Sequence, residues 1–175
     1  MKPIICLVTG PAGVGKSTIT KELAKKFINS ARVDVDYIRK MIVSGYVKPF
    51  RDSKKIRAQL LLSRKNACSI AKNFIESGFC VFIDDVILKE SSLDYYLESL
   101  SDYKVFVFLL FCNKDVLRKR DTARPKGQVM GKRALQLHDD FSKRLDEKRW
   151  FVIDTSKSTV AKTTKQIIGL IKKNF

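Results

Sequence analysis

The chain has 175 residues, of which 45% are hydrophobic and 30% charged, and these values predict one globular domain with a well-buried core. Its longest apolar runs are far shorter than the ~20 residues of a membrane-spanning helix, and its first residues do not resemble a signal peptide, so we expect a cytoplasmic protein without a membrane segment. The formal net charge of +17 indicates either a lysine-rich solvated surface or a surface that meets a polyanion such as nucleic acid.

Apolar, strand-like runs alternate with helical patterns along the chain. We expect strands at residues 4–9, 31–35, 79–83, 105–111 and 150–153. We expect helices at residues 18–28, 54–77, 91–101, 114–123, 129–148 and 158–173. This order predicts a single α/β domain over residues 1–175, with a parallel sheet of about five strands covered by helices on both faces. Ligands of such sheets bind beyond the carboxyl ends of the strands.

The segment 10–17 reads GPAGVGKS, which has the spacing G-x-x-x-x-G-K-[ST] of a phosphate-binding loop (P-loop). It stands between a predicted strand and a predicted helix, where glycines let backbone N–H groups and the helix N-terminus face phosphate oxygens. Lys16 is predicted to reach the β- and γ-phosphates, and the Ser17 hydroxyl to ligate Mg²⁺. The residues expected to bind the nucleotide here are Gly10, Pro11, Ala12, Gly13, Val14, Gly15, Lys16, Ser17 and Thr18.

Aspartates follow the second and third predicted strands. Asp36 comes just past the second strand, where a carboxylate can take the proton of an acceptor hydroxyl, so we predict it as the general base, with helix capping as its structural alternative. Arg39 lies one helical turn further on and is predicted to hold the acceptor, whereas Asp34 is expected to point the other way along the strand. Asp84 is predicted to hold Mg²⁺ through a water or to touch the acceptor, and Asp85 is the other candidate there.

Basic residues gather around two arginines that are four positions apart and therefore share a helix face, Arg120 and Arg124. Guanidinium groups neutralise the charge of a transferring phosphoryl group, and a mobile segment that carries them can close over ATP. We predict a lid at about residues 118–130, with both arginines catalytic and residues 126–127 as a hinge. The structural alternative is a solvated basic helix.

The remaining polar candidates carry weaker signals. His138 is expected on a helix surface rather than as a base. Cys6, Cys68, Cys80 and Cys112 lack C-x-x-C spacing and are expected to be buried, reduced thiols.

These residues resemble the small P-loop kinases related to chloramphenicol phosphotransferase. The resemblance covers nearly the whole chain and rests on residues 10–17 and 35–36, on IDDVIL at 83–88, on RDTAR at 120–124 and on IDT at 153–155. It implies a P-loop NTPase fold, three-layer α/β/α and nucleoside-kinase-like, with ATP and Mg²⁺ bound. It also implies phosphoryl transfer to a hydroxyl of a small molecule, with Asp36 as the base. Asp154 and Thr155 would then belong to the loop around the adenine.

The identity of the acceptor is left open. Residues 36–39 and the Arg120/Arg124 pair are also similar to phage-type polynucleotide 5′-kinases, in which the arginine of the first motif holds a phosphate. The expected acceptor-binding region 36–66 is rich in Lys and Arg, which favours a nucleotide or polynucleotide 5′-hydroxyl as the alternative acceptor. A third alternative is an ATP-binding switch or NTPase without an acceptor. ATP or GTP preference and oligomeric state stay open as well.

Overall fold

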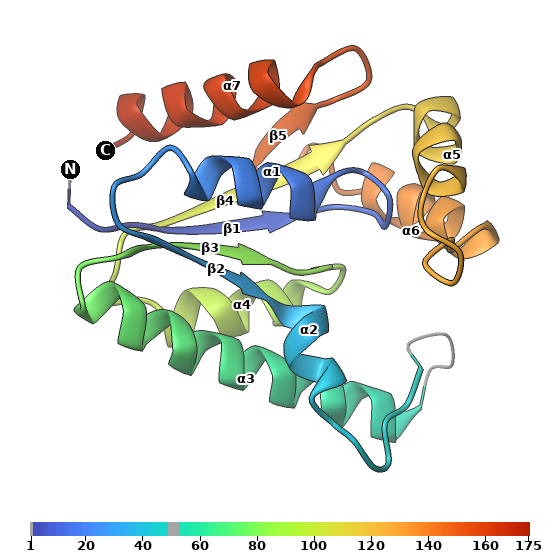
Figure 1. Cartoon of the computed structure of the whole chain (residues 1–175), viewed down its shortest axis with the longest axis horizontal. Coiled ribbons are helices and arrows are strands. Elements are labelled where there is room, and N and C mark those ends of the chain that lie inside the picture. The colour runs from blue at the N-terminus through green and yellow to red at the C-terminus, as the bar shows by residue number, and fades with distance from the viewer. Residues whose placement is uncertain (1, 49–52) are drawn as a thin grey trace.

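The structure is a computed structural model that describes residues 2–48 and 53–175. Arg51 and Asp52, which belong to the expected acceptor-binding region, lie outside the described residues. The described residues form one sheet of five parallel strands in the order β2-β3-β1-β4-β5 (Figure 1). The strands are β1 (Ile5–Thr9), β2 (Ser30–Asp34), β3 (Cys80–Asp84), β4 (Val105–Phe111) and β5 (Phe151–Asp154).

The strand β1 lies at the centre of the sheet and leads into the phosphate loop. From β1 the chain passes to β2 on one side of the sheet, and after β3 it crosses to β4 on the other side. The strand order therefore reverses at β1, and the crevice beyond its carboxyl end is the usual ligand site of such a sheet. Val8 is in register with both Asp84 and Phe108, and Asp34 is in register with Asp84, so four strands end near this crevice.

Helices cover both faces of the sheet. In Figure 1, α1 and α7 lie over one face and α3 and α4 over the other, while α5 and α6 stand beyond the carboxyl ends of the strands. The helices are α1 (Lys16–Ala24), α2 (Val35–Lys40), α3 (Lys54–Glu76), α4 (Glu90–Ser99), α5 (Lys114–Thr122), α6 (Lys132–Ser142) and α7 (Val160–Lys173).

The strands supply the two cores by simple alternation of their side chains. On one face, Cys6 and Val8 of β1 pack in the cluster that contains Leu23 of α1 and Ile167 of α7. On the other face, Leu7 packs in the cluster that includes the α3 and α4 side chains. Both faces of β1 are therefore buried, which fixes the position of the loop that follows it.

The expected fold class is confirmed, and each expected strand appears within about one residue at either end. The helix α2 was not among the expected helices, and it forms because the Asp34 side chain accepts a hydrogen bond from the Tyr37 N–H at its start. The helix α6 is shorter than the expected 129–148. It begins after Gly131, whose φ is +55°, and beyond Ser142 the chain turns so that Arg144 lies over the ring of Trp150.

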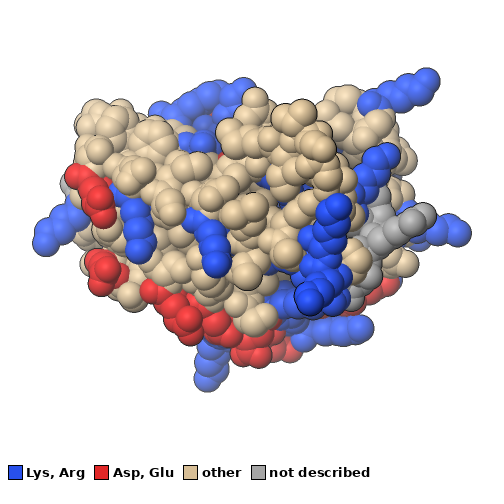
Figure 2. Space-filling view, turned by 90° about the horizontal axis from the view of Figure 1, so that it is seen from below, with Lys and Arg blue, Asp and Glu red and all other residues tan. Residues whose placement is uncertain are grey.

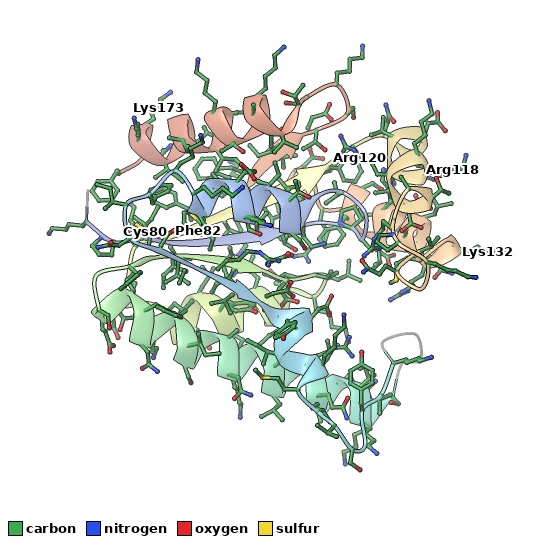
Figure 3. All side chains as sticks on the ribbon, viewed as in Figure 1. Cys80, Phe82, Arg118, Arg120, Lys132 and Lys173 are labelled. Carbon is green, nitrogen blue, oxygen red and sulfur yellow. The ribbon has the colours of Figure 1, made fainter. Side chains whose placement is uncertain are left out.

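The cysteines follow the sequence-based expectation, whereas His138 departs from it. All four cysteines are buried and free, as expected. His138 is not on the surface: it is 6% exposed, stacks on the Phe111 ring and lies 2.8 Å from the Cys112 carbonyl through Nε2. In Figure 3, Cys80 and Phe82 lie in the sheet, whereas Arg118 lies on the outer side of α5. Within the described residues, every helix is too short or too polar to cross a membrane.

Candidate active site

The conformation of the phosphate loop depends on the positive φ of Gly10 and on hydrogen bonds from Lys16. Gly10 has φ +140°, and a Cβ atom there would lie 2.2 Å from the Leu110 carbonyl oxygen of β4, so only glycine fits. Lys16 is buried, and its Nζ donates to the carbonyl oxygens of Gly10 (3.1 Å) and Pro11 (3.2 Å). The loop then enters α1 at Gly15, and the first N–H groups of this helix have no partner within the helix.

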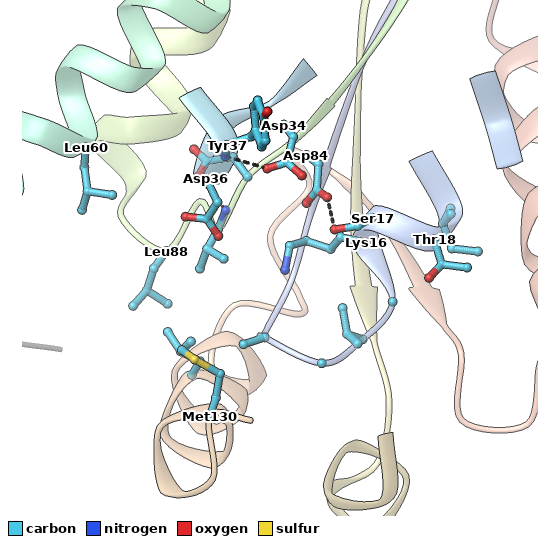
Figure 4. A pocket seen from close by; sticks show the side chains of 18 of the residues that line it. Lys16, Ser17, Thr18, Asp34, Asp36, Tyr37, Leu60, Asp84, Leu88 and Met130 are labelled. Carbon is cyan, nitrogen blue, oxygen red and sulfur yellow. Dashed lines mark hydrogen bonds between the residues drawn. The ribbon is translucent and has the colours of Figure 1, made fainter. Parts of the chain in front are cut away.

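A cavity of about 1330 Å³ opens beyond this loop. Its volume exceeds the ~300–1,000 Å³ of a typical small-molecule pocket, so it has room for a nucleotide and a second ligand together. Figure 4 shows part of the cavity, with Lys16 and Ser17 facing Asp84 and Asp34. The predicted site residues that line it are Ala12, Gly13, Val14, Gly15, Lys16, Ser17, Thr18, Asp36, Asp84, Asp85, Arg120, Arg124 and Thr155. Four other predicted site residues are not among the described residues that line the cavity: Gly10, Pro11, Arg39 and Asp154.

Ser17 and Asp84 meet where a cation would be needed beside the phosphates. The Ser17 hydroxyl donates to Oδ2 of Asp84, and Arg32 of β2 donates to the same oxygen through Nη2 at 3.1 Å. Burial is the main cause that raises the pKa of Asp84, and Lys16 and Ser17 oppose it. The oxygen donors of Ser17, Asp84 and Asp34 suit a hard cation such as Mg²⁺. No group of three or more His, Cys, Asp or Glu side chains placed to hold a metal ion occurs among the described residues.

Asp34 corrects one expectation. Its side chain faces the cavity instead of pointing away, because β2 ends at this residue and the carboxylate turns to cap α2, at 3.0 Å from the Tyr37 N–H. The helix cap is therefore Asp34 and not Asp36. Asp36 sits in the first turn of α2, 67% exposed and inside the cavity wall, where an acceptor can reach it.

Arg39 contacts Asp36 instead of facing the cavity. Its side chain is 3% exposed, and Nη2 lies 3.3 Å from Oδ1 of Asp36. Its Nη1 donates to the Val47 carbonyl at 3.1 Å, and the guanidinium lies over the Tyr46 ring at 5.0 Å. In this arrangement Arg39 orients a carboxylate and fixes a loop.

Asp85 is committed to internal contacts. Its Oδ2 accepts from Nε of Arg64 at 2.7 Å and from the Tyr96 hydroxyl at 3.2 Å, while Oδ1 accepts from the Val86 N–H. Arg64 also donates to Ser92 at 2.9 Å. This network joins α3 and α4 to the end of β3, so the two neighbouring aspartates differ: Asp84 faces the phosphate loop and Asp85 supports the wall.

Arg120 braces the wall opposite the carboxylates. It donates to the Val14 carbonyl at 3.2 Å and to both the hydroxyl and the carbonyl of Thr155, at 2.8 and 2.7 Å. The phosphate loop and the loop after β5 are thereby joined. Asp154 instead accepts from the N–H and hydroxyl of Ser156, and these two bonds lower its pKa.

Asp121 fixes the segment that follows α5. It is 3% exposed and accepts hydrogen bonds from the N–H groups of Met130 (3.0 Å) and Gly131 (2.7 Å) and from Arg124 (3.3 Å). Its Cβ also lies against Gly13, where an added Cβ would be 3.4 Å away. The predicted lid is therefore pinned at both ends next to the phosphate loop.

The cavity wall on the side of Asp36 includes apolar side chains, and Lys40, Arg57 and Lys89 line the same cavity. Figure 4 shows Leu60 of α3, Leu88 after β3 and Met130 before α6 around the space in front of this carboxylate. Tyr37 and Leu61 line the same cavity and are 68% and 42% exposed. A ligand that meets Asp36 through a hydroxyl would lay an apolar face on these side chains.

Basic side chains do not form one continuous track on the face shown in Figure 2. They are spread over it, and acidic side chains gather along one edge. Within the basic region of the sequence, Arg64 is buried against Asp85 and Arg39 against Asp36. Some of the positive charge that favours a nucleic-acid acceptor is therefore paired with carboxylates of the same chain.

Three site residues had not been singled out from the sequence: Arg32, Arg64 as a partner of Asp85, and Asp121. A weak signal exists for Arg32, because it stands two positions before Asp34 and so shares its strand face. Asp121 lies between the two predicted lid arginines. Its spacing of three residues to Arg124 is typical of an ordinary ion pair on a helix surface, so the sequence does not indicate that it is buried. Its burial depends on tertiary packing.

Solved structures share this fold. The tunicamycin resistance protein of Deinococcus radiodurans superposes with a TM-score of 0.69 at 16% identity, over 97% of this chain and 95% of its own. A gluconokinase from Sinorhizobium meliloti 1021 gives 0.69 at 18% identity, over 98% and 93%. The Mycobacterium tuberculosis APS kinase in complex with AMPPNP and APS gives 0.68 at 14% identity, over 98% of each chain.

These identities support a shared fold, the fold of P-loop kinases. No curated protein matches the sequence. A family model described as an AAA domain matches residues 6–140, which include the phosphate loop, the carboxylates Asp34, Asp36, Asp84 and Asp85, and the segment that Asp121 fixes. The chain therefore belongs to this AAA domain family.

Proposed function

We propose that this protein is an ATP-dependent kinase that transfers the γ-phosphate to a hydroxyl group of a small molecule, with Asp36 as the general base. One observation carries the proposal: a single cavity begins at Lys16 and Ser17 of the phosphate loop and ends at the exposed carboxylate of Asp36. A nucleotide-binding switch needs the first part of this cavity and has no use for the second.

The phosphate side supplies charge stabilisation. Lys16 and the N-terminus of α1 bind the β- and γ-phosphates, and Arg124 at the cavity wall adds a positive charge where the phosphoryl group passes. Arg120 and Thr155 build the wall on the nucleotide side through their three contacts. When bound with the nucleotide, Mg²⁺ neutralises phosphate charge; Ser17 would ligate it and Asp84 would hold it through the Ser17 hydroxyl or a water.

The acceptor side supplies the base and the orientation. Asp36 accepts the proton of the acceptor hydroxyl as the new P–O bond forms, and Arg39 holds its carboxylate from behind. The apolar wall of Leu60, Leu88 and Met130 would orient the rest of the acceptor. This combination favours a small molecule with an apolar face and a hydroxyl group.

Two of the arginines that favour the polynucleotide alternative are engaged inside the fold. Arg39, which would hold a phosphate near the 5′-hydroxyl, is buried and bound to Asp36 and Val47. Arg64 from the basic segment is bound to Asp85. We propose that, within the P-loop kinases, the chain belongs to the chloramphenicol phosphotransferase-like group, which its IDDVIL and RDTAR segments resemble.

The proposal is tested by transfer of label from γ-labelled ATP, with Mg²⁺, to two acceptor sets. One set holds hydroxylated small molecules with an apolar ring, including chloramphenicol, and the other holds nucleosides and 5′-hydroxyl oligonucleotides. We expect label on a member of the first set, lost in Asp36→Asn and kept in Asp115→Asn, a carboxylate of α5 that is 83% exposed.

Label on an oligonucleotide would overturn the acceptor class. In that case binding should weaken steeply as salt rises, because each neutralised phosphate releases counterions. Nucleotide binding without transfer to any acceptor, and with ATP hydrolysis unchanged in Asp36→Asn, would overturn the kinase assignment itself.

A further inference from the structure

Two carboxylates stand side by side at the ends of β2 and β3. Asp34 and Asp84 are direct register partners on these neighbouring parallel strands, and both line the cavity beside Ser17 (Figure 4). Like charges placed opposite each other on adjacent strands destabilise a sheet. The Asp84 side chain is only 6% exposed, so water alone screens this repulsion poorly. A local counter-ion is needed whenever no cation is bound.

Arg32 has the geometry of that counter-ion. It stands two positions before Asp34 on β2 and therefore on the same face of the strand. Its Nη2 lies 2.7 Å from Oδ2 of Asp34 and 3.1 Å from Oδ2 of Asp84. Its Nε donates to the buried Thr20 hydroxyl of α1 at 2.9 Å. One end of the guanidinium is thus anchored on the helix that follows the phosphate loop, and the other bridges both carboxylates.

We propose that Arg32 is a positioning residue for metal uptake: it holds Asp34 and Asp84 together in the absence of Mg²⁺ and keeps the affinity of the empty site for free Mg²⁺ low. This inference rests on the proposed function. Arg32 cancels one of the two negative charges that the carboxylates present to an incoming cation, in addition to the positive charge of Lys16 that also acts on Asp84. The site therefore takes up Mg²⁺ together with the nucleotide phosphates, which supply the remaining negative charge.

The planar fork of arginine is essential to this role. The ammonium group of a lysine is a single point and cannot bind Thr20 through one nitrogen and the carboxylates through another. Arg32→Lys therefore keeps the charge and loses the anchored geometry, whereas Arg32→Met keeps only an unbranched stem and loses both. Arg118→Met is the matched control, since Arg118 is 60% exposed on the outer side of α5 and pairs only with Asp115 among the contacts described for it (Figure 3).

The experiment measures two quantities on the full chain. The first is thermal unfolding of the nucleotide-free protein across a millimolar range of MgCl₂ at constant ionic strength. The second is the Mg²⁺ concentration that gives half-maximal ADP binding in calorimetry. In Arg32→Met we expect a lower melting temperature, a clear stabilisation by Mg²⁺ alone, and a half-maximal Mg²⁺ concentration that falls about three- to tenfold. Arg32→Lys should lie between this variant and the wild type, and Arg118→Met should match the wild type.

Equal Mg²⁺ dependence in Arg32→Met and Arg118→Met would overturn the proposal, because a merely structural arginine lowers stability without changing metal uptake. If Arg32→Met does not fold, the double variant Arg32→Met/Asp34→Asn should fold again, because it removes both the arginine and the repulsion between the two carboxylates. A double variant that also fails to fold counts against the proposal. If the wild type does not bind ADP, the proposed function fails, and the Mg²⁺ response of the nucleotide-free variants still decides the role of Arg32.

Discussion

Arg39 holds Asp36 from behind, with Nη2 of the arginine 3.3 Å from Oδ1 of the aspartate and 3% of the arginine side chain exposed. The two residues are three positions apart on α2, so they share a helix face. The aspartate is largely exposed to the cavity while its partner is buried. This division lets the carboxylate meet an acceptor without losing its orientation.

Asp36→Asn is expected to lose phosphoryl transfer by about 10²–10⁴-fold, the usual contribution of a general base. The free energy of unfolding should fall by about 1–2 kcal/mol, because the amide oxygen still accepts from Arg39 but this buried guanidinium loses its counter-charge. ADP affinity, measured by calorimetry, should not change, since Asp36 lies at the acceptor end of the cavity. An equal loss of ADP binding and transfer would contradict the assignment of Asp36 as the base.

Arg39→Met is expected to act differently. It removes the donor to the Val47 carbonyl as well as the support of Asp36, so we expect a loss of about 1–3 kcal/mol in the free energy of unfolding. The turnover number should fall as well, with ADP affinity retained. Urea unfolding and steady-state kinetics measure the two effects. Arg118→Met is the control, because Arg118 is 60% exposed on α5 and does not line the cavity, and it should keep wild-type turnover. Unchanged turnover in Arg39→Met would contradict the positioning of Asp36 by Arg39.

The sequence predicted the parts of this site that depend on local pattern. The phosphate loop, the strands and Asp84 follow from spacing, hydrophobicity and strand order, and the structure places them together. The direction of Asp34 does not follow from the sequence pattern, because Asp34 is the last residue of β2 and its side chain turns there to cap α2. Arg32 was overlooked because its role depends on the register of β2 against β3, which no local pattern determines.

Asp121→Ala is expected to release the segment 123–131 from the phosphate loop. The carboxylate is buried and accepts two backbone N–H groups and Arg124, so its loss leaves these donors unpaired at a cost of about 1–3 kcal/mol. Trypsin should then cut faster after Lys126 in the native protein; the bond after Arg124 is followed by Pro125 and resists trypsin. Asp115→Ala on the exposed side of the same helix is the control and should be cut at the wild-type rate. Equal cleavage rates in both variants would show that Asp121 does not fix this segment.

The buried thiols predict how stability changes in alkaline solution. Burial raises the pKa of Cys68 to about 11 from 9.0, so in the folded protein the thiol keeps its proton where the unfolded chain loses it. A group whose pKa is raised by folding contributes its full stability below the unfolded pKa, and this contribution is lost as the pH rises through the folded pKa. The free energy of unfolding should therefore fall between about pH 9 and pH 11.

Cys68→Ala isolates this contribution from the lysines and tyrosines that titrate over the same range. The variant will be less stable at every pH because it loses packing in the core, but its stability should fall less steeply than that of the wild type above pH 9. Urea unfolding under reducing conditions, repeated along the pH range, measures both slopes. Parallel slopes for the two proteins would show that the Cys68 thiol ionises equally easily in the folded and unfolded chains, contrary to its burial in the cluster beneath α3.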